Sequence, residues 1–102
     1  MKVYINRKDG TKAVGEYNSE TNALIVLSGA IVSSTVNRSE KFRGTATIER
    51  LREEYVKNGI VVEDVTFKSP STAANFVTGA SSNGLTVWKD ETGKKLKDVI
   101  SK

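Results

Sequence analysis

The residue types that carry most enzyme chemistry are sparse in this sequence. Its 102 residues include no histidine and no cysteine, so the usual proton carrier near neutral pH, the thiolate nucleophile and the commonest zinc ligands are missing. Glu63 and Asp64 are adjacent. Adjacent side chains on an extended chain point to opposite faces, so these two carboxylates make a poor acid–base pair. We therefore expect a protein that is not an enzyme, with no catalytic residues, no metal site and no cofactor.

The serines have no histidine to activate them, so they are candidates for binding rather than for nucleophilic attack. Ser69 and Ser71 flank Pro70 at the predicted start of a helix. The backbone N–H groups and the positive end of the dipole at a helix start can bind a small anion, including a DNA phosphate. Helix capping, the commoner use of such a serine, remains the alternative for Ser69.

A second candidate lies where a polar turn over residues 81–84 leads to the single tryptophan, Trp88, and to Lys89. A tryptophan can provide a stacking surface for a base while a neighbouring lysine attracts phosphate. A lone tryptophan in a small domain is more often the largest residue of the core. In a strand over Leu85–Trp88, Thr86 and Trp88 would share one face, and this alternation leaves both interpretations open.

The charge is mildly basic and evenly spread. The 16 lysines and arginines against 12 acidic residues give a net charge of +4, and no segment resembles a basic arm or tail. Two stretches, Thr21–Asn37 and Ser69–Trp88, contain no charged residue. They are either a buried hairpin and a buried helix with its turn, or a neutral hydrogen-bonding surface suited to a base edge. This balance permits phosphate binding without demonstrating it.

Hydrophobic periodicity predicts the elements that position these candidates. Short strands are expected over Val3–Ile5, Lys12–Tyr17 and Ala23–Leu27. Turn residues separate them, which indicates an antiparallel meander. From Thr45 to Asn58 the apolar residues recur at helical spacing, which predicts an amphipathic helix that stops at Gly59.

The second half of the chain predicts further short elements. In chain order, they are a hairpin or one bent strand over residues 60–67, a helix over 69–78 that stops at Gly79, a strand over Leu85–Trp88 and a short helix over Lys94–Lys102. A chain of this length fits one domain. We expect residues 1–102 to form a single α+β domain, in which a small antiparallel sheet or meander carries one amphipathic helix and one short helix.

The run from Lys68 to Lys89 resembles a known family pattern of Ser-Pro-Ser, two alanines, an apolar pair, Gly-x-Ser, Asn-Gly and a Trp-Lys ending. It is similar to the family called domain of unknown function 4357 and to the restriction-enzyme-associated (RAMA) domains. Gly15-x-Tyr17 and the run Ile25–Gly29 also agree, so the likeness covers about residues 15–89. The resemblance implies a domain that accompanies nuclease or restriction–modification modules and contacts DNA.

These observations lead to the hypothesis of a non-catalytic, DNA-binding accessory domain of restriction- or nuclease-associated type. The expected contact residues are Ser69, Ser71, Ser81, Ser82, Asn83, Gly84, Trp88 and Lys89. The alternative is a protein–protein interaction or stand-alone structural module that uses the uncharged hairpin. The longest apolar run, Ala23–Leu27, is far short of the ~20 residues of a membrane span. We therefore expect a cytoplasmic protein of bacterial type without a membrane partner, with a monomer favoured.

Overall fold

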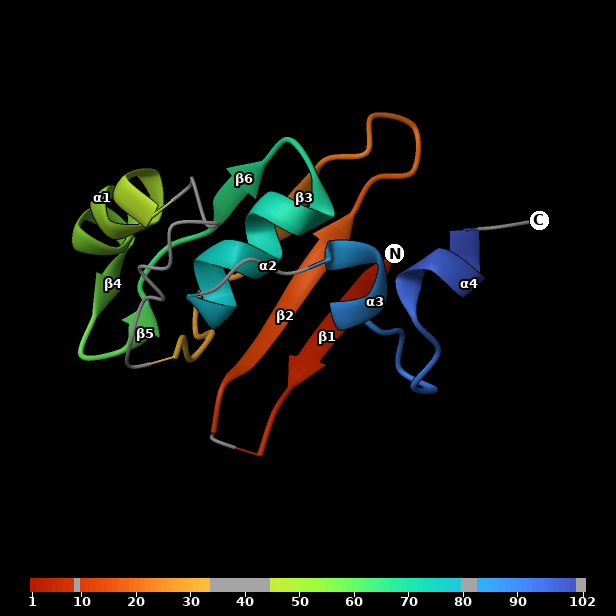
Figure 1. Cartoon of the computed structure of the whole chain (residues 1–102), viewed down its shortest axis with the longest axis horizontal. Helices are drawn as coiled ribbons and strands as arrows, with labels where there is room; N and C mark the ends of the chain where they lie inside the picture. Colours follow the sequence, from red (N-terminus) through yellow and green to blue (C-terminus); the bar gives the residue numbers. More distant parts are fainter. Residues whose placement is uncertain (9, 34–44, 80–82, 101–102) are drawn as a thin grey trace.

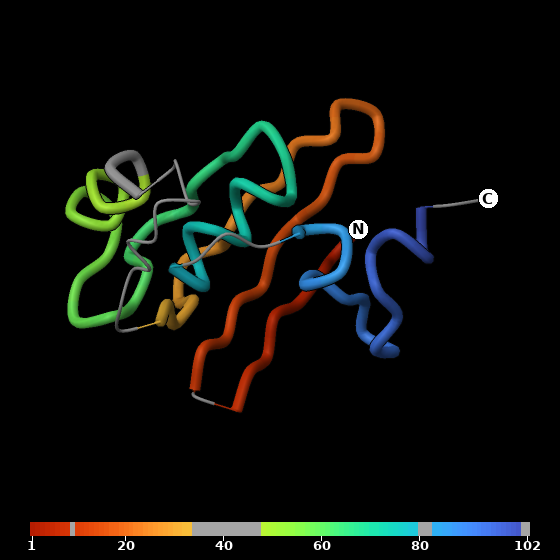
Figure 2. Tube along the Cα trace, viewed as in Figure 1, coloured from red at the N-terminus to blue at the C-terminus, as the bar shows by residue number. Residues whose placement is uncertain are grey.

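The main sheet is antiparallel and has the strand order β1-β2-β3-β6 (Figure 1). The computed structural model describes residues 1–8, 10–33, 45–79 and 83–100. The four strands are β1 (Lys2–Asn6), β2 (Lys12–Tyr17), β3 (Leu24–Val26) and β6 (Val65–Phe67). The predicted α+β class and the three-stranded meander are confirmed. The β1–β2 hairpin projects beyond the helices that cover the sheet (Figure 2).

Side-chain alternation gives the sheet one buried face. Val3 and Ile5 on β1 are buried, whereas Lys2 and Asn6 on the same strand are exposed. Helix α2 (Pro70–Thr78) packs against β2, β3 and β6 on the buried face. Its small residues Ala73 and Ala74 are fully buried, which lets the helix axis lie close to the strands, as the sequence predicted.

The rings of Phe67 and Phe76 meet between β6 and α2, with centroids 5.2 Å apart and a tilt of 43°. Gly15, at the centre of β2, lies under the same core. A Cβ at this position would be 2.8 Å from the end of the Leu24 side chain and 3.3 Å from the Trp88 ring. The glycine at this position therefore serves close packing within a regularly paired strand rather than a β-bulge.

Helix α1 (Thr45–Tyr55) ends earlier than the sequence predicts. The chain continues into strand β4 (Val56–Lys57), which pairs with β5 (Ile60–Val61). Asn58 and Gly59 join these strands with φ values of 55° and 79°. Two successive residues at positive φ form the two-residue turn that hairpins favour. The prediction of a helix to Asn58 that stops at Gly59 is wrong, because Asn-Gly here is a hairpin turn.

The expected hairpin or bent strand over residues 60–67 is also wrong, because β5 and β6 pair with β4 and β3 in different sheets. Arg52 of α1 reaches across to the end of α2. Its Nε and Nη2 donate to the Phe76 carbonyl at 3.0 and 2.8 Å. It also donates to the carbonyls of Val77 at 3.1 Å and Ser33 at 2.8 Å. Burial lowers the pKa of Arg52 from its usual value.

The C-terminal region holds two short helices, α3 (Gly84–Val87) and α4 (Leu96–Ile100). The predicted strand over Leu85–Trp88 is wrong. The Asn83 side chain accepts the Leu85 N–H at 3.0 Å, and this cap starts a helical turn in its place. The predicted helix over Lys94–Lys102 is confirmed only over α4, and residues 101–102 lie outside the described part. No described helix is long and apolar enough to cross a membrane.

Candidate nucleic-acid interface

The segment that carries the family resemblance folds into an interlocked structural unit. The side chain of Trp88 is fully buried, and its Nε1 donates to the Pro70 carbonyl at 3.0 Å. Gly84 lies directly against the start of α2, where a Cβ would be 2.2 Å from the carbonyl carbon of Pro70. The Gly84 N–H donates to the Ser71 hydroxyl at 3.0 Å. These contacts fix α3 on the first turn of α2.

This unit accounts for most of the contact residues predicted from the sequence. Ser69 caps α2, since its hydroxyl accepts the Thr72 N–H at 3.3 Å. Ser71 and Gly84 bond to each other, and Asn83 caps α3. The prediction of a stacking surface at Trp88 is wrong, because no part of its side chain is accessible to a base. The predicted residues Ser81 and Ser82 lie outside the described part of the chain.

Lys89 remains exposed and adds a further segment to the edge of the sheet. Its N–H donates to the Tyr4 carbonyl at 3.0 Å, and its own carbonyl accepts the Tyr4 N–H at 2.6 Å. Lys95 pairs with Lys89 from the other side. Directly opposed residues of antiparallel segments share a face. Lys95, Lys89, Tyr4 and Val14 therefore form one lateral row across the sheet.

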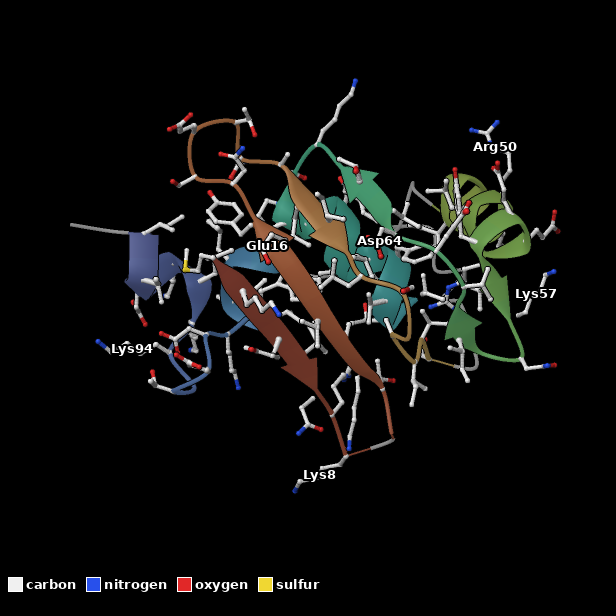
Figure 3. All side chains as sticks on the ribbon, turned by 180° about the vertical axis from the view of Figure 1, so that it is seen from behind. Lys8, Glu16, Arg50, Lys57, Asp64 and Lys94 are labelled. Atoms are coloured by element: carbon white, nitrogen blue, oxygen red, sulfur yellow. The ribbon has the colours of Figure 1, made fainter. Side chains whose placement is uncertain are left out.

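Two further rows lie on the same face, opposite to the helix α2. One runs from β1 through the Ile31 bridge to the β4–β5 hairpin, and consists of Asn6, Lys12, Ile31, Ile60 and Lys57. The other crosses the main sheet and consists of Lys2, Glu16, Ile25 and Thr66. We call the residues of these three rows the open face. Figure 3 shows this side, with β1 and β2 in front of the helices and Glu16 and Lys57 labelled.

The open face is positively charged. Its three rows contain five lysines and one carboxylate, Glu16, whose Oε1 lies 3.1 Å from the N-terminal ammonium of Met1. Asp64, labelled on the same side in Figure 3, accepts the Ser28 N–H at 2.8 Å, and Asp90 and Glu91 line the neighbouring groove. Like charges directly opposite each other on a sheet are destabilising, and Lys89 and Lys95 form such a pair. An anion placed between them would relieve this repulsion. The arrangement therefore favours a negatively charged ligand.

Apolar side chains lie between these lysines. Tyr4, Val14 and Ile25 are partly exposed, and Ile31 and Ile60 reach 42% and 45% exposure. Such exposed apolar groups beside lysines suit a ligand that has both charged and apolar surface. A phosphate backbone with accessible bases has this combination.

A groove of about 1080 Å³ lies beside the open face. Strands β1 and β2 line it together with the turn over residues 28–30 and the segment from 86 to 93. Tyr4, Lys12, Val14 and Lys89 belong both to this lining and to the open face. The groove thus extends the surface that these side chains offer to a ligand.

The loop after Lys89 is held in shape by the Asp90 carboxylate, which forms one wall of the groove. Its Oδ1 accepts hydrogen bonds from the Thr92 hydroxyl at 2.7 Å and from the Thr92 and Lys94 N–H groups at 2.9 Å each. The Thr92 hydroxyl, followed by the backbone N–H groups of Lys94 and Thr92, lowers the pKa of the Asp90 carboxyl. The Asp90 carboxylate is therefore stabilised by hydrogen bonds within its own turn.

Sequence reasoning named Lys89 but missed the remaining open face. The sequence of β1 could have indicated part of this face. Val3 and Ile5 are apolar, and Lys2, Tyr4 and Asn6 alternate with them. The pairing of Tyr4 with Lys89 joins residues that are distant in sequence, so it carries no local pattern. Among the described residues, no three acidic side chains gather closely enough to hold a metal ion.

Comparison with known proteins places the chain in a family. The family model described as "Domain of unknown function (DUF4357)" matches residues 3–100 of the chain. No curated protein and no solved structure matches it.

Proposed function

The chain belongs to the family described as domain of unknown function (DUF4357), and from that premise we propose that it is a non-catalytic nucleic-acid-binding domain. The open face is its binding surface. We further propose that it accompanies restriction or nuclease modules as an accessory domain, with DNA as the partner. Ser69, Ser71, Asn83 and Gly84, which were expected to contact DNA, serve mainly to shape the fold.

The observation that carries the proposal is the charge of the open face, with five lysines against one carboxylate that is already paired. Lysines that contact phosphates release the counterions condensed on a nucleic acid, and this release drives binding. The whole chain has a net charge of only +4. The open face alone, with five positive groups and one negative group, accounts for an excess of the same size. The three rows thus combine several positive groups on one face of the sheet.

Salt-dependent binding of charge-reversal variants tests the proposal. Lys89→Glu should weaken binding of a labelled oligonucleotide and flatten the plot of log affinity against log salt by about 0.7–0.9 for each phosphate that the variant no longer neutralises. Arg50→Glu, at an exposed position of α1 (Figure 3), makes the same change in net charge on an element that contributes no residue to the open face. Fluorescence anisotropy at low and physiological salt measures both variants. An equal effect of the two reversals would mean diffuse attraction and would overturn the proposed site.

A second candidate function is a protein-interaction module. Ile31, Ile60 and Val62 are exposed by 42%, 45% and 48%, and apolar groups of this size on a surface are suited to a protein partner. Sedimentation equilibrium of the free chain tests self-association. A mass that rises with concentration, and that falls back to one chain in Ile60→Ser, would favour this function. A constant single-chain mass counts against self-association.

A further inference from the structure

We infer that the ligand of the open face is a single strand of nucleic acid and that one of its bases stacks on Tyr4. This inference rests on the proposed function and deepens it, because it names the form of the nucleic acid and the residue that contacts a base.

Tyr4 lies inside the sheet and points away from the core. Its neighbours on the same strand, Val3 and Ile5, are 0% and 3% exposed and face the helices, whereas Tyr4 itself is partly exposed. The backbone of Tyr4 is paired on both sides, with Val14 on β2 and with Lys89 at the edge. A ring on a strand that is fixed from both sides is a rigid platform. Aromatic side chains on sheets are used for base stacking in this way.

Cations surround this ring at positions that suit a phosphate backbone. Lys89 lies directly across from Tyr4, and Lys95 follows Lys89 in the same row. Lys12 lies one row away, opposite Asn6. Neighbouring segments of a sheet are about 4.8 Å apart. A base on Tyr4 would therefore have positive charge on both sides within the reach of a lysine side chain.

The width of the sheet opposes recognition of a duplex by the open face. The Lys89 segment, β1, β2, β3 and β6 lie side by side, so they span about 19 Å at the usual spacing of ~4.8 Å between strands. The major groove of B-DNA is ~12 Å wide and admits a helix or a two-stranded ribbon. The whole face cannot enter it. A single strand can instead lie across the surface.

The apolar members of the open face also favour unpaired bases. The outer surface of a duplex presents mainly phosphates and polar base edges, with the thymine methyl groups as its apolar part, so it would offer Ile31, Ile60 and Val14 few apolar partners. Every unpaired base has a flat apolar face, and stacking on side chains tolerates any sequence. A single strand therefore matches both the lysines and the apolar groups between them.

Anisotropy titrations with probes of equal length test the inference. The probes are a labelled 20-nucleotide oligo-dT, the corresponding oligo-rU, and a 20-base-pair duplex, each at physiological salt. Tighter binding of a single strand than of the duplex is expected, and the comparison of oligo-dT with oligo-rU distinguishes DNA from RNA. Tyr4→Leu keeps an apolar side chain but removes the ring, and Tyr4→Phe keeps the ring. The emission of the buried Trp88 checks that each variant is folded.

Tyr4→Leu should weaken single-strand binding by about 5- to 150-fold, the range for loss of one stacked base. Its salt dependence should equal that of the unmodified chain, because no charge is removed, and Tyr4→Phe should bind normally. Unchanged affinity in Tyr4→Leu, or tighter binding of the duplex, overturns the inference while leaving the proposed function intact. Sensitivity of duplex binding to Lys8→Ala would then point to the hairpin end, where Lys8 is exposed (Figure 3). Absence of binding to every probe overturns the proposed function itself.

Discussion

Replacement of Arg52 by methionine tests how the two main helices are joined. Arg52 donates to the carbonyls of Phe76 and Val77 in the last turn of α2 and to the Ser33 carbonyl. The last turn of α2 contains no basic residue of its own. A helix end leaves its final carbonyls without partners and carries partial negative charge. Ser33 supplies donors to this end as well, with its N–H 2.9 Å from the Val77 carbonyl and its hydroxyl 2.6 Å from the Thr78 carbonyl. The guanidinium adds the positive charge and the donors to the Phe76 carbonyl.

These contacts determine how much the free energy of unfolding falls in Arg52→Met. A hydrogen bond to a charged group contributes about 1.5–3 kcal/mol, and a carbonyl left without a partner costs about 1–3 kcal/mol. The methionine retains most of the apolar stem, and water can reach a side chain that is only partly buried. Desolvation of the guanidinium, which also lowers its pKa, offsets part of the gain. We therefore expect Arg52→Met to lower the free energy of unfolding by about 3 kcal/mol, which is about 12–24 °C in Tm for a domain of this size.

Urea unfolding followed by the emission of Trp88 measures this loss. Arg50→Met is the matched control, since Arg50 lies on the same helix and is exposed, so its replacement should cost at most about 0.5 kcal/mol. Arg52→Lys should fall between the two, because an ammonium lacks the planar fork that reaches several carbonyls at once. If Arg52→Met cost no more than Arg50→Met, the carbonyls would be satisfied without the guanidinium, and the reasoning would be refuted.

Two further predictions concern the C-terminal region. Gly84→Ala should destabilise the fold by at least about 3 kcal/mol in urea, because its Cβ would lie 2.2 Å from the backbone of Pro70. Gly15→Ala should cost less, since its Cβ would first meet the end of the Leu24 side chain at 2.8 Å, and equal costs would contradict this argument. The pKa of Asp90 is lowered in the folded state, so its turn should be intact above pH ~4 and open only as the pH falls through the lowered value. The amide resonances of Thr92 and Lys94 report this opening. A midpoint at or above the ordinary aspartate pKa, or an unchanged transition in Asp90→Asn, would contradict the assignment.

Local pattern predicted most of the fold because most of its elements are stabilised by their own neighbours. The strands β1, β2 and β3 follow from β-type runs between turns, and α2 follows from Ser69 and Gly79 at its ends. The end of α1 was predicted wrongly because the same pair of residues is typical of two different structures. Asn58-Gly59 can end a helix or turn a hairpin, and the identity of the next strand decides between them.

The α3 segment shows how tertiary contact overrides strand propensity. Leu85, Thr86 and Val87 alternate as a strand would, but the Asn83 cap and the tight contact of Gly84 with the start of α2 place them in a helical turn. This turn carries Trp88 into the core. Without it the indole would not reach the Pro70 carbonyl. An interpretation based on alternation therefore assigned the wrong element and could not decide the role of Trp88, which is a core residue.

The run of residues that carries the resemblance in the sequence and the residues proposed to bind are largely different. Pro70, Ser71, Gly84 and Trp88 contribute backbone contacts and hydrogen bonds inside the fold, so a match based on them reports the shape of the domain. Tyr4, Lys12 and Lys95 lie outside the run from residue 68 to residue 89, and only the sheet brings them beside Lys89.

Membership of the family therefore supports the scaffold more directly than it supports the ligand. Another chain can keep the contacts among Pro70, Gly84 and Trp88 and still present different side chains on the open face, because the two sets occupy opposite sides of the sheet. Binding by the family as a whole would then say little about Tyr4. The test of function in this chain depends on the open face itself, where removing one ring at Tyr4 and one charge at Lys89 separates stacking from phosphate attraction.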